Sequence, residues 1–140
     1  MRFKRTVAAL AVAAGMAASG LVAATPASAD MAGADCGGSG AFVCLYYSPR
    51  ASGYGAVFKQ GGDIANYSGY TFSCSHFGCS GAGQPVRNNA AAMDSSLTVG
   101  FTVYYSVNYD CSYSCQSIPA YGLADLNGSM RNNNASGRTS

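Results

Sequence analysis

The chain contains no glutamate and a single histidine, His76, and no long stretch of it has helical periodicity. Apolar residues come in short aromatic and β-branched runs that Gly, Asn, Ser and Pro interrupt repeatedly, which is typical of strands joined by turns. The sequence therefore predicts an almost wholly β fold. The clearest predicted strands cover residues 42–47, 56–59, 97–106 and 116–118.

Only one apolar run is long enough to concern a membrane, and it lies at the N-terminus. Three basic residues precede apolar and small residues over 6–24, and an A-x-A cleavage site follows at 27–29. This pattern predicts a secretory signal peptide over residues 1–29 and a mature domain over 30–140. No second run approaches the roughly 20 apolar residues of a membrane-spanning helix. We expect a soluble, secreted, extracellular protein with no membrane contact after cleavage.

Charged residues are scarce, with 8 Lys and Arg against 6 Asp and no Glu in the whole chain. Three of the basic residues belong to the predicted signal peptide, so five remain against six acidic ones, and the mature net charge is −1. Nucleic acids and anionic membranes both require clustered Lys and Arg. Neither is an expected partner, and we expect a monomer.

Six cysteines remain after the signal peptide. An even number in a small exported protein predicts disulfides, which help a domain too small for a large core. The spacing favours three local pairs, although the sequence alone does not choose among the possible connectivities. Metal binding is disfavoured by the single histidine and by the absence of paired C-x2-C spacing. The favoured pairs are Cys36–Cys44, Cys74–Cys79 and Cys111–Cys115.

No catalytic constellation is evident. A hydrolase triad would have to use His76, and the chain has no G-x-S-x-G motif. Oxidised cysteines supply no nucleophilic thiolate, and nothing marks two of the six aspartates as a glycosidase pair. We therefore expect a protein that is not an enzyme and that has no cofactor.

Three blocks of the first half return in the same order in the second half, which predicts a duplicated unit. The first unit covers about 42–92 and the second about 99–136, and the first has an additional stretch near 70–84. Two copies of a few short strands suggest two Greek-key units packed as a sandwich. The matching blocks are 45–48 with 103–106, 65–69 with 124–128, and 86–92 with 130–136.

These blocks resemble those of the βγ-crystallins, because each unit runs from an aromatic hairpin to a late Asn-Asn block. The version found here reads C…F-V-C-L-Y, then G-Q-P-V-R-N-N-A-A, then R-N-N-N-A-S. It is similar to the peptidase inhibitor I36 family, whose best-known member is a small Streptomyces inhibitor of thermolysin-like metalloproteases. The resemblance covers residues 36–136. It implies a double Greek-key β-sandwich and a secreted inhibitor of an extracellular, thermolysin-like protease.

The resemblance also implies a reactive loop, a disulfide-closed excursion in the first hairpin of the second unit. By position, the protease would contact residues 111–115, and the bond presented would be Cys111–Ser112. The loop between Cys111 and Cys115 is one residue shorter than the C-x4-C loop of the known inhibitor. Ser112 stands where an apolar S1′ pocket would take a larger side chain, and Tyr113 supplies that contact if the register shifts by one. The contacting residues are Cys111, Ser112, Tyr113, Ser114 and Cys115.

The loop over 74–79 is a secondary candidate, with an exposed-looking Phe77 and with His76, whose imidazole suits zinc. A solvated loop histidine is the simpler interpretation of His76. A purely structural role for both rings, which would then only fix the tips of hairpins, stays open.

Two other classes of function also stay open. Asn132, Asn133 and Ser136 keep the outline of the crystallin calcium motif, whereas the block at 88–92 ends in alanine. Calcium prefers anionic oxygens, so binding is expected to be weak, and asparagines that cap a turn are the alternative. The third class is a secreted antimicrobial that resembles killer-toxin-like proteins of the same fold.

Overall fold

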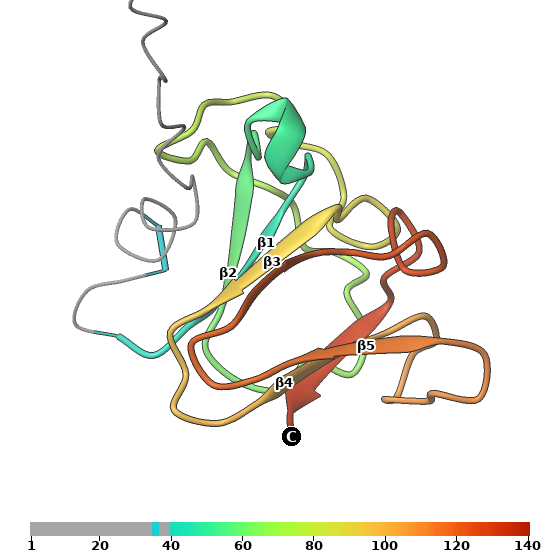
Figure 1. The fold of residues 1–140 in the computed structure, drawn as a ribbon. Coiled ribbons are helices and arrows are strands. Elements are labelled where there is room, and N and C mark those ends of the chain that lie inside the picture. Colours follow the sequence, from blue (N-terminus) through green and yellow to red (C-terminus); the bar gives the residue numbers. More distant parts are fainter. Residues whose placement is uncertain (1–34, 37–39) are drawn as a thin grey trace, which may run out of the picture.

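The computed structural model describes residues 35–36 and 40–140. The signal peptide predicted over 1–29 lies outside the described residues. Within them the chain forms a small all-β domain with two antiparallel sheets and one 3-10 turn, η1 (Arg50–Ser52) (Figure 1). The first sheet has the order β2-β1-β3-β6, with β1 (Val43–Tyr46), β2 (Val57–Gln60), β3 (Ala92–Ser95) and β6 (Leu123–Asp125). The second has the order β5-β4-β7, with β4 (Phe101–Tyr104), β5 (Cys115–Ile118) and β7 (Ser136–Thr139).

The two repeated segments exchange their middle parts between the sheets. Strand β3, which begins where the first segment ends, pairs with β1 on one side and with β6, from the second segment, on the other. Strand β7 pairs with β4, and Gly137 within it also forms a bridge with Ile64 of the first segment. Each segment therefore contributes a strand or a bridge to the sheet of the other, which ties the two together.

The main hydrophobic core receives side chains from both sheets. Residues alternate between the two faces of a strand, so Val43 and Leu45 of β1 point into this core together with Met93 of β3. Phe101 and Val103 of β4 enter it from the second sheet. The core therefore joins the two sheets.

The other face of the first sheet carries a smaller hydrophobic cluster. Cys44 and Tyr46 of β1 point into it and meet Tyr54 from the hairpin that follows. Because both faces are covered, all four residues of β1 are buried. This explains why the strand reads as a continuous apolar run rather than as an alternation.

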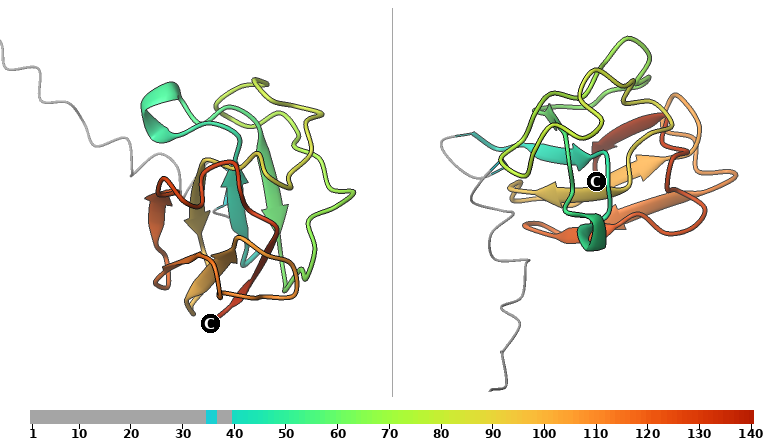
Figure 2. Two further views of the ribbon diagram at one scale, coloured as in Figure 1. Left: turned by 90° about the vertical axis from the view of Figure 1, so that its right-hand side faces the viewer. Right: turned by 90° about the horizontal axis from the view of Figure 1, so that it is seen from above.

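The long connection between β2 and β3 lies beyond β2, at the edge of the first sheet (Figure 2). Val57 and Ser73 exchange backbone hydrogen bonds of 2.8 and 2.9 Å, which fix part of this connection to the edge. The connection contains the additional stretch of the first unit.

Three disulfides join Cys36 to Cys44, Cys74 to Cys79, and Cys111 to Cys115, which are the local couples favoured by spacing. Cys36 and Cys44 are completely buried, whereas the other two bonds close loops at the surface. Disulfides of this number are typical of secreted or extracellular proteins. Within the described ranges, no helix is long and apolar enough to cross a membrane.

Candidate functional site

The hairpin between β4 and β5 projects from one end of the second sheet (Figure 1). Its base is tied to the rest of the protein at several points. Tyr105 N–H donates to the Ser114 carbonyl at 3.0 Å, and Asn108 N–H donates to the Ala65 carbonyl at 2.8 Å. Tyr109 has a left-handed φ of 62°, and its N–H donates to the buried Ser136 Oγ at 3.2 Å. The loop therefore leaves the sheet from a fixed base.

The disulfide between Cys111 and Cys115 closes the tip of this hairpin into a small loop, which we call the ring (residues 111–115). Asp110, just outside it, accepts two hydrogen bonds at Oδ1, from Ser112 N–H at 2.8 Å and from Ser112 Oγ at 2.5 Å. These bonds favour the charged carboxylate and lower the pKa of Asp110. The first half of the ring is thus held by a local turn as well as by the disulfide.

Tyr113 is the most prominent side chain of the ring, with 74% of its surface exposed. The centroid of its phenol group lies 4.4 Å from that of the Tyr105 phenol group, with an angle of 45° between the two aromatic planes. Such a tilted aromatic contact restricts the rotamers of Tyr113 while leaving most of the side chain in solvent. The structure thus brings together the candidate contact residues 111–115, with Cys111, Ser112 and Tyr113 exposed and the other two half-buried.

Gln116, the residue after the ring, was not among the sequence candidates. Its Nε2 donates to the Asp125 carbonyl at 3.0 Å, and its Oε1 accepts from Asn127 N–H at 2.8 Å. Asp125 ends β6 of the other sheet, so one side chain connects the ring to both sheets. We call these two hydrogen bonds the Gln116 clamp. No local pattern marks the residue, because both partners are backbone groups, at the end of β6 and directly after it.

The loop over 74–79 is placed differently from the expectation. His76 is exposed, and its backbone N–H donates to Asp35 Oδ1 at 3.0 Å. Phe77 is half-buried instead of exposed, with ring centroids 5.0 Å from Tyr54 and 6.0 Å from Tyr46. Phe77 therefore covers the smaller hydrophobic cluster on the other face of the first sheet, while His76 and the two cysteines of the loop are exposed to solvent.

The Asn-Asn blocks stabilise turns in both halves of the chain. Asn133 Nδ2 donates to the Ser129 and Arg131 carbonyls at 3.1 and 3.2 Å. Asn89 Nδ2 makes the equivalent bonds at 3.0 and 3.2 Å to carbonyls of the first half. Asn132 is exposed, with a left-handed φ of 57°.

The same geometry tests the calcium candidate. Ser136 is fully buried, and its Oγ donates to the Ser106 carbonyl at 2.7 Å while it accepts from Tyr109 N–H. Calcium takes six to eight oxygen ligands and favours carboxylates. Asn132, Asn133 and Ser136 offer none, and the described part of the chain has no group of three His, Cys, Asp or Glu side chains placed to hold a metal. The residues as placed do not fit a calcium ion.

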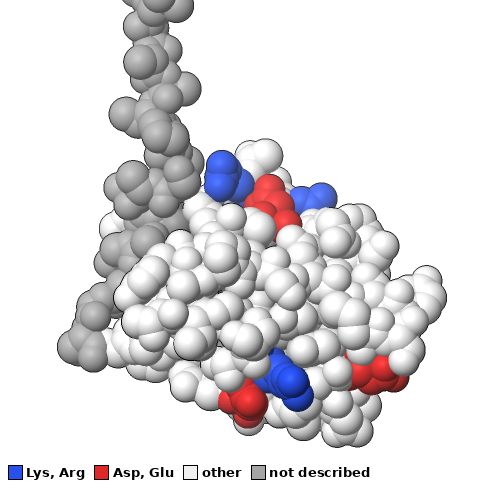
Figure 3. Space-filling view, turned by 60° about the horizontal axis from the view of Figure 1, so that its bottom comes forward, with Lys and Arg blue, Asp and Glu red and all other residues white. Residues whose placement is uncertain are grey.

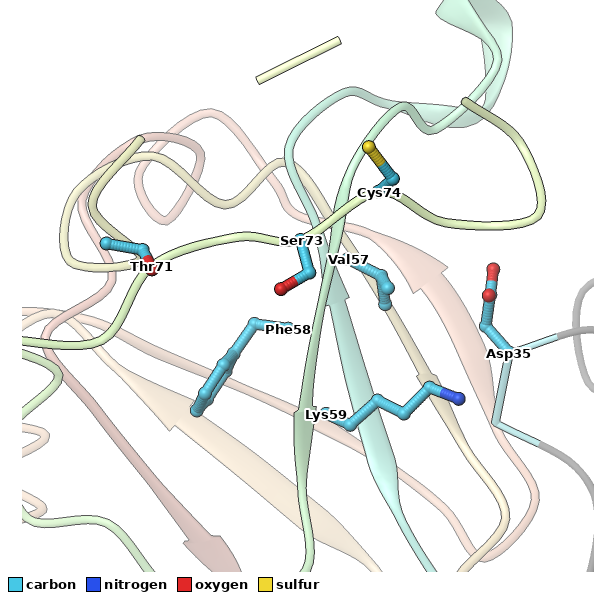
Figure 4. A pocket seen from close by; sticks show the side chains of 7 residues that line it. All are labelled: Asp35, Val57, Phe58, Lys59, Thr71, Ser73 and Cys74. Carbon is cyan, nitrogen blue, oxygen red and sulfur yellow. The ribbon is translucent and has the colours of Figure 1, made fainter. Parts of the chain in front are cut away.

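A pocket of about 410 Å³ lies along the edge of β2 (Figure 4). Lys59 and Asp35 reach it from one side, and Thr71 and Ser73 border it on the other. Asp35 also accepts a hydrogen bond of 3.4 Å from the Tyr46 hydroxyl through Oδ2. None of the residues that line the pocket belongs to the ring, and no pattern in the sequence indicates the pocket.

Asp94 lies on β3, on the face opposite to the main core residue Met93, with 1% of its surface exposed. Its Oδ2 has no hydrogen-bond partner among the residues that the structure describes. Burial raises the pKa of Asp94, and the nearby negative charge of Asp35 raises it further, against a backbone hydrogen bond from Ser95 that lowers it. Asp94 is a buried acid with a cost to stability rather than a surface recognition group.

The surface itself is sparsely charged. The face in Figure 3 carries only a few Lys, Arg and Asp side chains on a largely uncharged surface. Comparisons of the chain with protein-family models, with curated proteins and with solved structures gave no match. The ring is the place where a disulfide, a restrained backbone and an exposed aromatic side chain coincide, so it is our candidate functional site.

Proposed function

We propose that this protein is a secreted peptidase inhibitor that presents the ring to an extracellular, thermolysin-like metalloprotease. The observation that carries the proposal is the exposed Tyr113 at the tip of a loop held by a disulfide, by Asp110 and by the Gln116 clamp. A segment fixed before docking loses less freedom, which saves about 0.5–1.5 kcal/mol for each side chain that would otherwise be immobilised. The disulfide also holds the two ends of the ring together if the protease cuts between them.

The fold that we propose for this inhibitor is the βγ-crystallin-like double Greek key. The exchange of the middle segments between the two sheets supports it, as do equivalent hydrogen bonds in the two halves. Ala91 N–H donates to the Tyr46 carbonyl, and Ala135 N–H donates to the Tyr104 carbonyl, both at 2.8 Å. On this proposal the protein works by binding, as a monomer, without catalysis, cofactor, nucleic acid or membrane.

The proposal is tested by titrating the purified secreted chain against a thermolysin-like, a subtilisin-like and a trypsin-like protease. We expect inhibition of the thermolysin-like enzyme. Opening the ring with Cys111→Ser and Cys115→Ser together should weaken inhibition at least about tenfold, because several side chains then have to be ordered on binding. His76→Ala, in the loop over 74–79, is the control and should change nothing.

Two results would contradict the proposal. Loss of inhibition in His76→Ala with full inhibition by the opened ring would move the active loop to the first half of the chain. A wild-type protein that inhibits none of the three enzymes, but binds calcium or stops the growth of other bacteria, would replace the inhibitor with one of the alternative classes.

A further inference from the structure

We infer that Tyr113, and not Ser112, enters the protease's primary apolar pocket, so that the peptide bond presented is Ser112–Tyr113. This inference rests on the proposed function and deepens it, because it names the residue that determines specificity. It differs by one residue from the register Cys111–Ser112 that positional matching implies.

Ser112 is turned toward its own chain. Both its N–H and its hydroxyl donate to the same carboxylate oxygen of Asp110. To enter a pocket, the side chain would have to give up the hydroxyl bond or bring the charge of Asp110 close to an apolar wall, where an unpaired charge is costly. A serine also has very little apolar surface to bury in return.

Tyr113 has the opposite properties. It is the most exposed large hydrophobic residue among those the structure describes, ahead of Tyr121 at 68% and Tyr70 at 42%. Its contact with Tyr105 holds one side of the phenol group and leaves the other side free to be buried by a partner. Residues that dominate binding are typically rigid aromatic side chains that fill a pocket of the partner. Within residues 111–115, Tyr113 alone has such a side chain.

The backbone agrees with this assignment. The N–H of Ser112 is occupied by Asp110, whereas the N–H of Tyr113 makes no hydrogen bond in the described part of the chain. The Ser112–Tyr113 peptide group can therefore pair with the protease without a bond being broken. It also lies between Cys111 and Cys115, so the disulfide spans it.

Slow hydrolysis by the protease would follow this register. Water adds across the Ser112–Tyr113 amide, its hydroxyl goes to the Ser112 carbonyl carbon, and its proton goes to the Tyr113 nitrogen as the C–N bond breaks. The product keeps all its atoms in one molecule, heavier by one water, because the disulfide between Cys111 and Cys115 stays intact. After reduction it should separate into two chains.

The test combines inhibition constants with the position of the cut. Tyr113→Ala should weaken inhibition of the thermolysin-like protease roughly 30-fold or more, as expected for an anchoring aromatic residue. Tyr113→Leu should retain most of the inhibition, because leucine still offers a large apolar side chain to an apolar pocket. Tyr121→Ala is the matched control for loss of an exposed tyrosine and should have no effect. Prolonged incubation followed by reduction should yield a chain that begins at Tyr113.

Ser112→Leu separates the two registers. If Ser112 entered the pocket, leucine would strengthen inhibition, whereas our register predicts no gain. A gain of about tenfold or more, or a new chain that begins at Ser112, would overturn the inference and leave the inhibitor proposal standing. A wild-type protein that inhibits no protease would instead overturn the proposed function, and the register with it.

Discussion

Ala90 and Asn134 occupy equivalent positions in the two repeated segments and are hydrogen-bonded to each other. The N–H of Ala90 donates to Asn134 Oδ1 at 2.9 Å, and Asn134 Nδ2 donates to the Val86 carbonyl at 2.8 Å. Asn134 is completely buried. The segments therefore differ at this position because the asparagine of one satisfies two buried backbone groups of the other.

Replacing this asparagine should be among the most destabilising single changes in the chain. In Asn134→Ala the buried Ala90 N–H loses its partner, at about 1–3 kcal/mol, while the Val86 carbonyl keeps the bond of 3.2 Å that it accepts from Asn89 N–H. We therefore expect the free energy of unfolding to fall by about 2 kcal/mol. Urea denaturation with the disulfides intact measures it. Asn66→Ala is the control, since Asn66 is exposed and should change stability by less than about 0.5 kcal/mol. An unchanged urea midpoint in Asn134→Ala would contradict this account.

The sequence predicted the strands whose own residues favour strands. The aromatic and β-branched runs gave β1, β2 and β5 nearly at their observed bounds, and the C-terminal part of the run over 97–106 gave β4. It missed β3, β6 and β7, which read A-M-D-S, L-A-D and S-G-R-T. Ala, Asp and Gly are depleted in strands, so only pairing with distant partners makes these segments extended.

Gly137 shows why such pairing is invisible in the local sequence. It exchanges hydrogen bonds of 2.9 and 3.0 Å with Ile64, and its carbonyl also accepts from Gln60 Nε2 at 2.9 Å. A side chain at this position would collide with the Tyr67 hydroxyl and the Phe101 ring. A glycine that weakens a strand by its own preference is required here by its neighbours.

The same distinction applies to the candidate site. Cysteine spacing located the ring, because the two cysteines are close in sequence. The inward position of Phe77 could not be predicted, since its aromatic neighbours Tyr46 and Tyr54 come from a different hairpin. Asp94 was likewise unrecognised as a buried acid, because what buries it is the cover over the outer face of the first sheet.

Asp94 should make the protein less stable as the pH rises. Its folded-state pKa is raised above 3.8, so between 3.8 and that raised pKa the folded state holds more protons than the unfolded state. Stability therefore falls as the pH increases through this window. Asp94→Asn should remove this part of the slope and raise the urea midpoint at neutral pH. Asp63→Asn, at an exposed position, is the control, and an equal pH slope in wild type and Asp94→Asn would refute the account.

Asp110 should show the opposite behaviour. The pKa of Asp110 is lowered from 3.8 because Ser112 donates two hydrogen bonds to its carboxylate. The turn is therefore fully stabilised at pH values above 3.8, and this stabilisation is lost as the pH falls through the lowered pKa. Ser112→Ala removes one of these bonds and should bring the pKa back toward 3.8. An NMR titration of the carboxyl carbon measures this. Ser114→Ala, in the same ring, should leave the titration midpoint of Asp110 unchanged. If Ser112→Ala also had the wild-type titration midpoint, the bond from the Ser112 hydroxyl would contribute nothing to the pKa of Asp110.

The Gln116 clamp should determine how rigid the ring is. Gln116→Ala removes both hydrogen bonds to the turn after β6, so amide hydrogen exchange over residues 108–115 should become faster. The midpoint of global unfolding should change little, because both bonds are exposed.

Ser117→Ala is the matched control for the Gln116 clamp, because Ser117 also lies on β5 but bonds to the Thr102 hydroxyl at 2.7 Å and not to the turn. If the ring binds a protease, Gln116→Ala should also release it about threefold to tenfold faster, since most effects of interface changes appear in the dissociation rate. Gln116→Glu should have a smaller effect than Gln116→Ala, because a carboxylate can still accept from Asn127 N–H although it cannot donate to the Asp125 carbonyl. Unchanged exchange over 108–115 in both Gln116 variants would show that the disulfide and Asp110 hold the ring without the clamp.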